Sequence, residues 1–343
     1  MNNSTHQTST GNGLLVAAIT ALFLLAWGTS FTALAAKADY LPKQKMRIPK
    51  DNQLTPERIE LGKALFFDPR LSDSNRMSCA SCHNPSLYWT DGLRKGVGKG
   101  SQTLKRATPT LVNVGYSRRL FWDGRAKGLE AQALVPLKST IEMNQNIAEL
   151  IRELSAIPGY VELFAKAYPD EGITELTIAK ALASFERSIV SPYDSPFDRW
   201  VAGDDKALSA AAKRGFDLFD GKARCSVCHS GQNFTDNSFH NIGLNNDDDI
   251  GRYEFIKVQV LKGAFKTPTL RDITRTAPYM HNGEYQTLDQ VIDHYVKGGV
   301  DKSNLSPDMK PVKLSRQEQA DLLEFLQSLT DEPQPVTVPV LPN

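Results

Sequence analysis

Apolar residues recur at helical spacing in three segments of this chain. Residues 56–67 begin with a proline and then repeat apolar side chains every three or four positions. Residues 177–190 and 315–329 show the same period. Strand patterns are scarce, and residues 255–261 are the best short candidate. The pattern predicts a mainly α protein with little sheet.

The two halves of the chain repeat one pattern. Three pairs of short segments match in the same order: 62–68 with 215–220, 107–111 with 266–270, and 122–124 with 281–283. The last two pairs share one constant offset, which we call the repeat offset. We therefore predict two copies of one module, a first domain at residues 45–204 and a second at 205–330. The Pro-rich tail, residues 331–343, is expected to be extended and to pack back on the first module.

The N-terminus has the composition of a targeting segment. Residues 1–36 contain no Lys, Arg, Asp or Glu, and most of the stretch from residue 14 onward is apolar. Its last four residues, Ala-Leu-Ala-Ala, fit a small-x-small cleavage site. The segment is also long enough to span a bilayer. We therefore predict export to the periplasm by a signal peptide that is either cleaved or retained as a membrane anchor.

Composition adds little beyond this. Hydrophobic residues make up 41% and charged residues 23%, which are ordinary globular values. Lys and Arg total 40 against 39 for Asp and Glu, so the formal net charge is +1. This balance gives no electrostatic reason to expect a nucleic-acid partner.

The four cysteines fall into two identical patterns. Each is Cys-x-x-Cys-His, formed by Cys79, Cys82 and His83 and by Cys225, Cys228 and His229. This motif is typical of c-type haem attachment, in which two thiols bond to the haem vinyl groups and the histidine binds the iron. A shared Cys₄ zinc site, a thioredoxin-like redox pair and structural disulfides are the alternatives. Two copies that use every cysteine of an exported chain favour two covalently bound haems.

The repeat predicts that the two haems differ on their second axial side. Tyr295 corresponds to Pro136 at the repeat offset. Because a proline side chain cannot ligate iron, the first haem is expected to stay open to peroxide while the second takes a sixth ligand. From position alone, Met280, His281 and His294 are alternatives to Tyr295 for that ligand.

Together these motifs resemble the bacterial di-haem cytochrome c peroxidase family, including its MauG-like branch. The resemblance covers about residues 49–330 and rests on residues 60–72, 79–83, 121–126, 142–144, 267–271 and 277–283. It implies a mainly α fold of two tandem cytochrome c-like domains, each with one covalently bound haem.

The resemblance also implies roles for single residues. Trp122 matches a tryptophan that mediates electron transfer between the haems, and Glu142 matches a glutamate that handles the peroxide proton. Gln132 matches a glutamine of the same distal pocket. Tyr295 stands where MauG-like members carry the second-haem ligand. Lys99 stands near the place of a displaceable histidine in peroxidases that need reductive activation, so the first haem is expected to be open without activation.

A calcium ion between the haems is a further implication of the resemblance. Thr276 and Pro278 match residues whose backbone carbonyls bind it, and hard oxygen ligands suit calcium. Ala107 stands where the family usually supplies an asparagine side chain, so calcium is expected to bind weakly or through water.

The resemblance implies an oxidoreductase that reduces hydrogen peroxide to water with electrons from a small cytochrome or copper protein. One alternative is a MauG-like enzyme that oxidises residues of a partner protein through a bis-ferryl state. Another is a non-catalytic di-haem electron carrier. Family members are often dimers, so a homodimer is an expected form.

Overall fold

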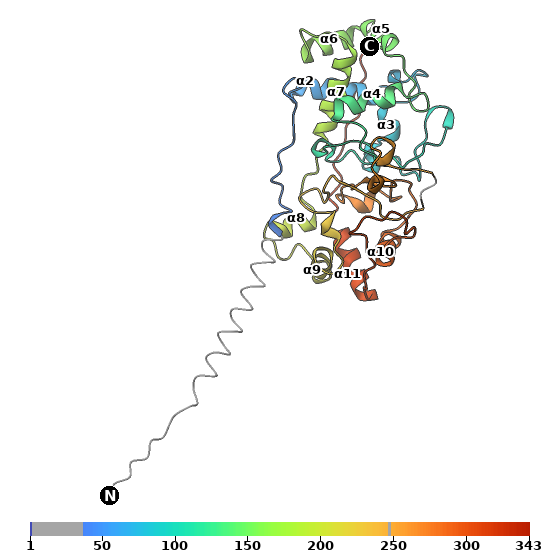
Figure 1. The fold of residues 1–343 in the computed structure, drawn as a ribbon. Coiled ribbons are helices and arrows are strands. Elements are labelled where there is room, and N and C mark those ends of the chain that lie inside the picture. Colours follow the sequence, from blue (N-terminus) through green and yellow to red (C-terminus); the bar gives the residue numbers. More distant parts are fainter. Residues whose placement is uncertain (2–36, 246–247) are drawn as a thin grey trace.

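A computed structural model describes residues 1, 37–245 and 248–343, and its main described part forms two helical lobes (Figure 1). The predicted signal or anchor, residues 1–36, lies outside the described residues except for Met1. Within the described chain, no helix combines the length and the apolar character needed to cross a bilayer.

The first lobe contains the motif helix and the helices that surround it. In chain order these are α2 (Pro56–Phe67), α3 (Cys79–Cys82), α4 (Leu129–Lys138), α5 (Ile147–Ser155), α6 (Pro158–Ala167) and α7 (Glu175–Ser188).

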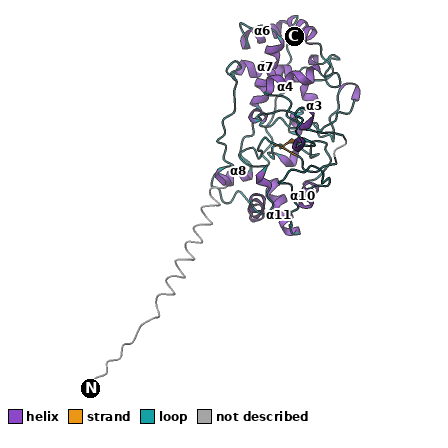
Figure 2. Cartoon of the chain, viewed as in Figure 1, coloured by secondary structure: helices purple, strands orange, loops and turns teal. Residues whose placement is uncertain are grey.

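The second lobe holds the remaining helices and a short strand pair. These are α8 (Pro196–Val201), α9 (Ala210–Asp220), β1 (Phe239–His240), β2 (Phe265–Lys266), α10 (Leu288–Lys297) and α11 (Arg316–Gln327). Strands β1 and β2 pair antiparallel and are very short, so helices and loops dominate the described chain (Figure 2). The mainly α prediction is confirmed.

Each lobe is built around an equivalent pair of packed helices. In the first lobe α2 packs against α7, and in the second α9 packs against α11. Both contacts need a glycine, because a Cβ on Gly62 would lie 1.9 Å from the carbonyl oxygen of Ala181. A Cβ on Gly215 would likewise lie 2.0 Å from the carbonyl oxygen of Asp321. Absence of this Cβ lets the two backbones approach closely in both lobes.

Each lobe has its own apolar core. The first core joins α2, α4, α5, α6 and α7. The second is rich in aromatic rings that pack edge to face, a geometry that adds to the stabilisation from burial. Its central rings are Tyr40, Phe197, Phe216, Phe234 and Phe325.

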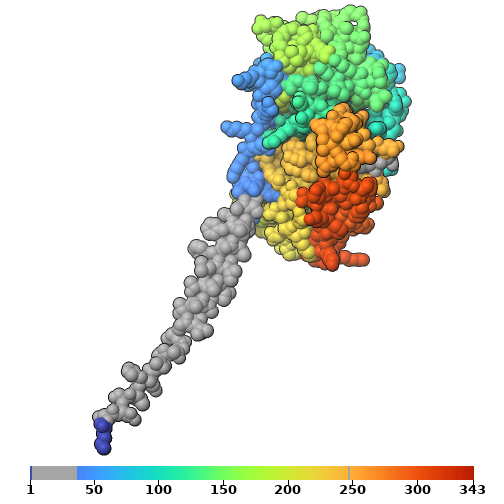
Figure 3. Space-filling model, in the orientation of Figure 1, coloured from blue at the N-terminus to red at the C-terminus, as the bar shows by residue number. Residues whose placement is uncertain are grey.

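The two ends of the described chain cross over between the lobes: the blue segment after residue 37 starts at the second lobe and runs up to the first (Figure 3), and the C-terminus lies beside α5 of the first lobe (Figure 1). Near the start of the main described range, Tyr40 is buried in the second core. At the C-terminus, Val336 packs against the first core and Arg70 donates a hydrogen bond to the carbonyl of Pro342 at 3.0 Å. The Pro-rich tail, which carries no helix or strand, therefore lies against the first lobe.

Most elements expected from the pattern are present. The helix at 56–67 matches α2, and those at 177–190 and 315–329 correspond to α7 and α11. The strand expected at 255–261 is wrong, because this segment lies in a loop that ends in the short 3₁₀ turn Gln259–Leu261. Its apolar side chains are largely exposed and its backbone bonds locally, so no neighbouring strand completes a sheet in this part of the described chain.

The domain limits at 45–204 and 205–330 stay a prediction. Helix α8 lies before residue 205 in the chain, yet Phe197 and Trp200 on this helix are buried in the second core.

Candidate functional site

A cavity of about 1000 Å³ runs through both lobes. It brings together every site residue expected from the sequence. Its lining includes Cys79, Cys82, His83, Trp122, Gln132, Glu142, Cys225, Cys228, His229, Thr276, Pro278 and Tyr295.

The two motif histidines are held in the same way. Nδ1 of His83 lies 3.0 Å from the carbonyl oxygen of Trp89, and Nδ1 of His229 lies 2.9 Å from that of Phe234. A hydrogen bond donated by Nδ1 to a carbonyl leaves Nε2 with a free lone pair for a metal. Burial lowers the pKa of both imidazoles, which favours the neutral, ligating form. Both sites therefore fit a haem iron.

The cysteines also fit haem attachment. All four thiols are free and line the cavity, so the disulfide alternative finds no support. A shared Cys₄ zinc site needs four sulfurs around one point. Among the described residues, the one grouping able to hold a metal joins Cys228 to Asp236 and His240 and contains no second cysteine. The zinc alternative is wrong for this geometry.

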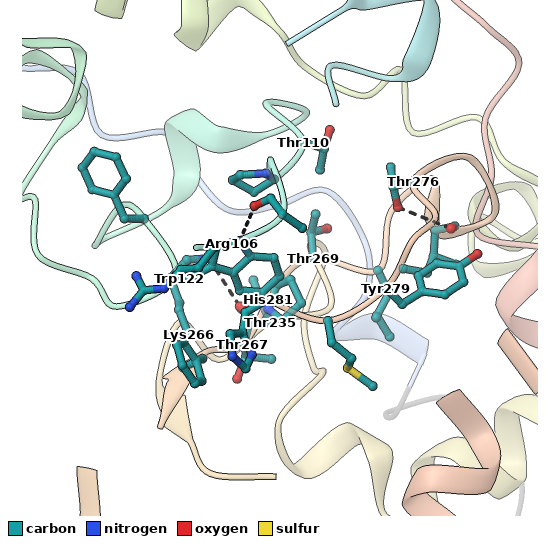
Figure 4. Close-up of a pocket in the computed structure, with 18 of the residues that line it drawn as sticks. Arg106, Thr110, Trp122, Thr235, Lys266, Thr267, Thr269, Thr276, Tyr279 and His281 are labelled. Carbon is teal, nitrogen blue, oxygen red and sulfur yellow. Dashed lines mark hydrogen bonds between the residues drawn. The ribbon is translucent and has the colours of Figure 1, made fainter. Parts of the chain in front are cut away.

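Where the lobes meet, equivalent residues of the repeat exchange backbone hydrogen bonds. The nitrogen of Ala107 donates to the carbonyl of His281 at 2.8 Å, and that of Lys266 donates to the carbonyl of Trp122 at 2.7 Å. Trp122 Nε1 also donates to the Ala107 carbonyl at 2.9 Å. Figure 4 shows Trp122, Lys266 and His281 gathered at this boundary. The indole is thereby fixed between the two halves of the cavity.

The distal residues expected for the first haem lie on α4 and the turn that follows it. Gln132 and Pro136 are one helical turn apart and both line the cavity. After the helix the chain folds back, and the nitrogen of Met143 donates to the carbonyl of Pro136 at 3.2 Å. This return brings Glu142 to the cavity beside them.

Two neighbouring segments hold the Glu142 turn in place. The backbone nitrogen of Lys99 donates to the carbonyl of Ile141 at 3.0 Å, and that of Asp73 donates to the carbonyl of Met143 at 3.1 Å. The Asp73 carboxylate pairs with the Lys99 ammonium and accepts a hydrogen bond from Asn144 at 2.6 Å. We call Asp73, Lys99 and Asn144 the Asp73 clamp. Its two hydrogen-bond donors, Lys99 first, lower the pKa of the Asp73 carboxyl.

Tyr295 lies on α10 and lines the cavity near the second motif. Burial, followed by the charges of Cys225 and Cys228, raises the pKa of its phenol. The alternative ligand His294 does not line the cavity, and both its ring nitrogens are engaged, with Tyr285 at 3.0 Å and the Ile242 carbonyl at 2.8 Å. His294 is therefore excluded as a ligand.

The other two alternatives for that ligand do line the cavity. Met280 and His281 are neighbours in the chain, and both contribute to its wall. The His281 ring stacks on Phe265 with 3.5 Å between centroids. This stacking fixes the imidazole at the lobe boundary beside Trp122.

The residues expected to bind calcium also lie at the cavity. Thr276 and Pro278 contribute to its lining, and Figure 4 shows Thr276 apart from the Trp122 group. Both polar backbone atoms of Ala107 are engaged with His281 and Trp122. Ala107 therefore belongs to the lobe boundary.

Sequence reasoning missed an ion-pair cluster beside the cavity. Arg106 forms a bidentate pair with Asp249 of the second lobe, at 2.8 and 2.9 Å, and also pairs with Asp123. Bidentate arginine–carboxylate pairs combine two charge-assisted hydrogen bonds, which are stronger than neutral ones. Arg106 directly precedes the repeated Thr-Pro segment, but no spacing rule in the sequence connects it to its distant partner.

Comparisons with known proteins agree with this arrangement. The di-haem cytochrome c peroxidase family model matches residues 56–206, and the cytochrome c model matches residues 212–330. The methylamine utilization protein MauG of Methylorubrum extorquens is 49% identical over 311 residues, which cover 90% of this chain and 88% of that protein. The cytochrome c551 peroxidase of Pseudomonas aeruginosa is 34% identical over 333 residues, 91% of this chain and 93% of that protein.

A solved structure shows the same fold. The crystal structure of a MauG-like protein associated with microbial copper homeostasis superimposes with a TM-score of 0.80 at 34% identity. The match covers 85% of this chain and 95% of that chain.

Proposed function

This chain belongs to the di-haem cytochrome c peroxidase family, and we propose that it reduces hydrogen peroxide to water with electrons from a small cytochrome or copper protein. It is an oxidoreductase with two c-type haems that acts on peroxide. The observation that carries the proposal is the cavity, which joins both Cys-x-x-Cys-His motifs and places Gln132 and Glu142 beside Pro136.

The proposed chemistry divides between the haem and the chain. A haem bound at His83 supplies an iron that exchanges electrons with peroxide. A carboxylate oxygen of Glu142 accepts a proton from hydrogen peroxide and returns it to the departing oxygen, which leaves as water. The Gln132 side chain orients the peroxide by hydrogen bonding. Two electrons and two protons from outside complete the conversion of one peroxide to two waters.

Trp122 is proposed to conduct electrons between the two haem sites. Its ring lies at the lobe boundary, and its Nε1 is held by the Ala107 carbonyl. His229 and Tyr295 are the two residues that would hold the iron of the second haem. The position of Tyr295 in the lining of the cavity, which the second motif also lines, supports this assignment.

A specific observation favours a second candidate function, the oxidation of residues in a partner protein. The chain is 49% identical to a MauG protein. The resemblance implies that Tyr295 stands at the ligand position of the MauG-like branch. An anionic tyrosine ligand favours high oxidation states of iron. In this alternative the electrons come from side chains of the partner protein instead of a redox carrier. A non-catalytic carrier is disfavoured by the distal residues gathered at Pro136.

Calcium binding, export and dimerisation are further parts of the proposal. We propose a calcium ion held by the backbone carbonyls of Thr276 and Pro278, both of which line the cavity.

The uncharged, apolar stretch within residues 1–36 supports export to the periplasm. Cell fractionation and N-terminal sequencing of the mature protein test export and cleavage. Sedimentation with and without a calcium chelator tests the homodimer and the ion together.

The decisive experiment adds hydrogen peroxide to the fully ferric protein and follows the haem absorption. We expect a fast spectral change at one equivalent of peroxide without prior reduction. Glu142→Gln should slow this change by roughly 10²–10⁴-fold, the usual contribution of a general acid–base group. Glu149→Gln, an exposed glutamate paired with Arg152 on α5, is the matched control and should react normally.

The same experiment separates the two candidate functions. Rapid turnover with a reduced small cytochrome or copper protein supports the peroxidase. A long-lived oxidised species that decays only on adding a partner protein supports side-chain oxidation. If the ferric protein is inert until one haem is reduced, the open first haem is disproved.

A further inference from the structure

The helices α7 and α11 occupy equivalent places in the two lobes, and their contacts set the register between them. The Ala181 carbonyl lies against Gly62 as the Asp321 carbonyl lies against Gly215. Ala181 therefore corresponds to Asp321. Any residue of α7 then corresponds to the residue of α11 that is separated from Asp321 by the same number of positions as the first is from Ala181.

A second set of contacts gives the same register. The carbonyl of Ile189 accepts a hydrogen bond from Asn113 at 2.9 Å, and the carbonyl of Leu329 accepts one from Asp272 at 3.1 Å. Ile189 follows Ala181 at the same interval as Leu329 follows Asp321. The two acceptors thus occupy equivalent positions just beyond α7 and α11.

One pair of equivalent positions on α7 and α11 differs in polarity. Leu182 and Leu322 correspond, and both line the cavity. One helical turn later, Glu186 corresponds to Leu326, and both again line the cavity. The first lobe therefore carries a carboxyl group where the second lobe carries an apolar side chain against its haem site.

Glu186 lacks the partners that normally accompany a buried acid. The residue is only 6% exposed, and its Oε2 is buried without a hydrogen-bond partner. Burying a polar group without a hydrogen-bond partner destabilises the fold. Because a leucine fits the equivalent position of the second lobe, packing does not demand the carboxyl.

The charged groups around Glu186 do not neutralise it. Its neighbour Arg187 is engaged by Glu130 of α4, with 2.7 Å between Nη1 and Oε1 and 2.8 Å between Nη2 and Oε2. Burial is the main cause that raises the pKa of Glu186, to about 8, against the opposing charge of Arg187 and with the like charge of Glu130. Glu186 in turn acts, after burial, to raise the pKa of Cys79, which places it near the thiol that attaches the first haem.

We propose that Glu186 is a redox-linked proton site of the first haem, holding a proton when this haem is ferrous and releasing it when the haem is ferric. The balanced step is that one electron from an external donor and one proton from solvent convert ferric iron and the carboxylate to ferrous iron and the carboxylic acid. The inference rests on the proposed function in one respect, since it takes the group at His83 to be the first haem.

The coupling has a simple electrostatic origin. A carboxylate inside a cavity of low polarity stabilises the more positive, oxidised iron and is itself stabilised by it. Protonation removes that attraction when the iron is reduced. The reduction potential of the first haem should therefore depend on pH. The second haem has Leu326 at the equivalent position, so it lacks a carboxyl group that could couple its potential to pH.

The test is a spectroelectrochemical titration of the di-haem protein between pH 5 and 10, without peroxide. We expect the potential of the first haem to fall with pH in the wild type, approaching 59 mV per pH unit where one proton accompanies one electron. Glu186→Gln should flatten this slope and raise the potential at high pH. Glu186→Leu, which copies Leu326, should do the same. The haem whose spectrum responds to Tyr295→His is identified as the second.

Glu175→Gln is the matched control, because Glu175 is an exposed carboxylate of the same helix, paired with Lys138. It should keep the wild-type slope. An unchanged slope in both Glu186 variants, or a change confined to the second haem, overturns the proposal.

Redox-difference infrared spectra of the wild type add a measurement that needs no variant. At a pH where the potential of the first haem changes with pH, they should show a protonated carboxyl band in the reduced protein that is lost on oxidation, and its absence contradicts the proposal. Failure of peroxide reactivity in the ferric protein would leave this titration unaffected.

Discussion

Trp122 and His281 occupy the same position in the two copies of the repeat, and their rings meet edge to face across the lobe boundary with 6.3 Å between centroids. The backbone of each residue accepts a hydrogen bond from the other lobe, His281 from Ala107 and Trp122 from Lys266. The two lobes therefore meet through equivalent residues, as two subunits do around a two-fold axis. Aromatic rings therefore lie at this boundary and line the cavity that both lobes share.

Replacing Trp122 by Phe is expected to slow electron exchange between the haems by at least about tenfold. The change removes the indole and the Nε1 bond to Ala107, and it should lower the unfolding free energy by about 1 kcal/mol. Rapid mixing with peroxide, followed at both haem spectra, measures the exchange. Trp200→Phe removes an indole from the second core, away from the cavity, and should leave the exchange rate unchanged. Equal rates in both variants would contradict the role of Trp122.

Replacing Tyr295 by His should change the absorption spectrum and raise the potential of the second haem. A neutral imidazole stabilises high oxidation states less than an anionic phenolate does. Visible absorption and potentiometry detect both effects. Tyr285→Phe is the control, because Tyr285 contacts His294 and does not line the cavity. A spectrum that is the same before and after the Tyr295 change would assign the ligand to Met280 or His281, which line the cavity beside it.

The Asp73 clamp is expected to matter for peroxide chemistry although it lies at the surface. Asp73→Asn removes the charge that pairs with Lys99 and so loosens the turn that carries Glu142. Misplacement of a catalytic group by about 1 Å can cost about 100-fold in rate, so we expect a 10- to 100-fold slower reaction with peroxide. Stopped-flow mixing measures it.

Two comparisons make the clamp prediction specific. Lys99→Met should slow the reaction like Asp73→Asn, because either change breaks the same pair. Lys138→Met breaks an exposed pair with Glu175 and should have no effect. A normal rate in both clamp variants would show that the backbone bonds alone hold the turn.

The free energy of unfolding should fall with rising pH because Asp272, a buried acid of the second lobe, loses its proton. Asp272 is 3% exposed, and burial is the main cause that raises its pKa from 3.8 to about 6, while a backbone hydrogen bond from Asp331 opposes this rise. A carboxyl whose pKa is raised by folding stabilises the fold fully below its unfolded pKa and loses this contribution as pH rises through the folded pKa. Between about pH 3 and pH 7 the loss amounts to about 3 kcal/mol, most of it between pH 4 and 6.

Denaturant unfolding at several pH values measures this loss. Asp272→Asn should flatten the profile between pH 4 and 6, since an amide does not titrate. Asp204→Asn, a change in an exposed turn, should retain the wild-type profile. A wild-type profile in the Asp272 variant would assign the pH dependence to other groups.

Covalent and repetitive features made much of the site predictable. The Cys-x-x-Cys-His spacing is local, so it predicts six haem-binding residues without knowledge of the fold, and all six line the cavity. The repeat offset paired Tyr295 with Pro136 because both copies place this helix in the same way. Helix α2 was predictable to the residue, since Pro56 and the apolar period mark its start and its buried face.

Features that depend on distant contacts were not predictable. Arg106 pairs with Asp249 across the lobes, and nothing local to either residue indicates the other. The exposed apolar segment after Phe255 suggested a strand, but no neighbouring strand among the described residues completes it. Glu186 could have been found from the sequence only by aligning α7 with α11, and that alignment requires the contacts of Gly62 and Gly215.

Because the chain ends cross between the lobes, the first lobe cannot be completed until the second has been synthesised. The backbone nitrogen of Gly159, on α6, donates a hydrogen bond to the terminal residue Asn343 at 3.2 Å. Domains generally fold from the N-terminus as the chain is synthesised. The first lobe receives its cysteines early, yet its surface is covered by residues 336–343, which are synthesised after the whole second lobe. A chain truncated before the tail leaves both lobes with their haem-binding motifs and the first lobe uncovered.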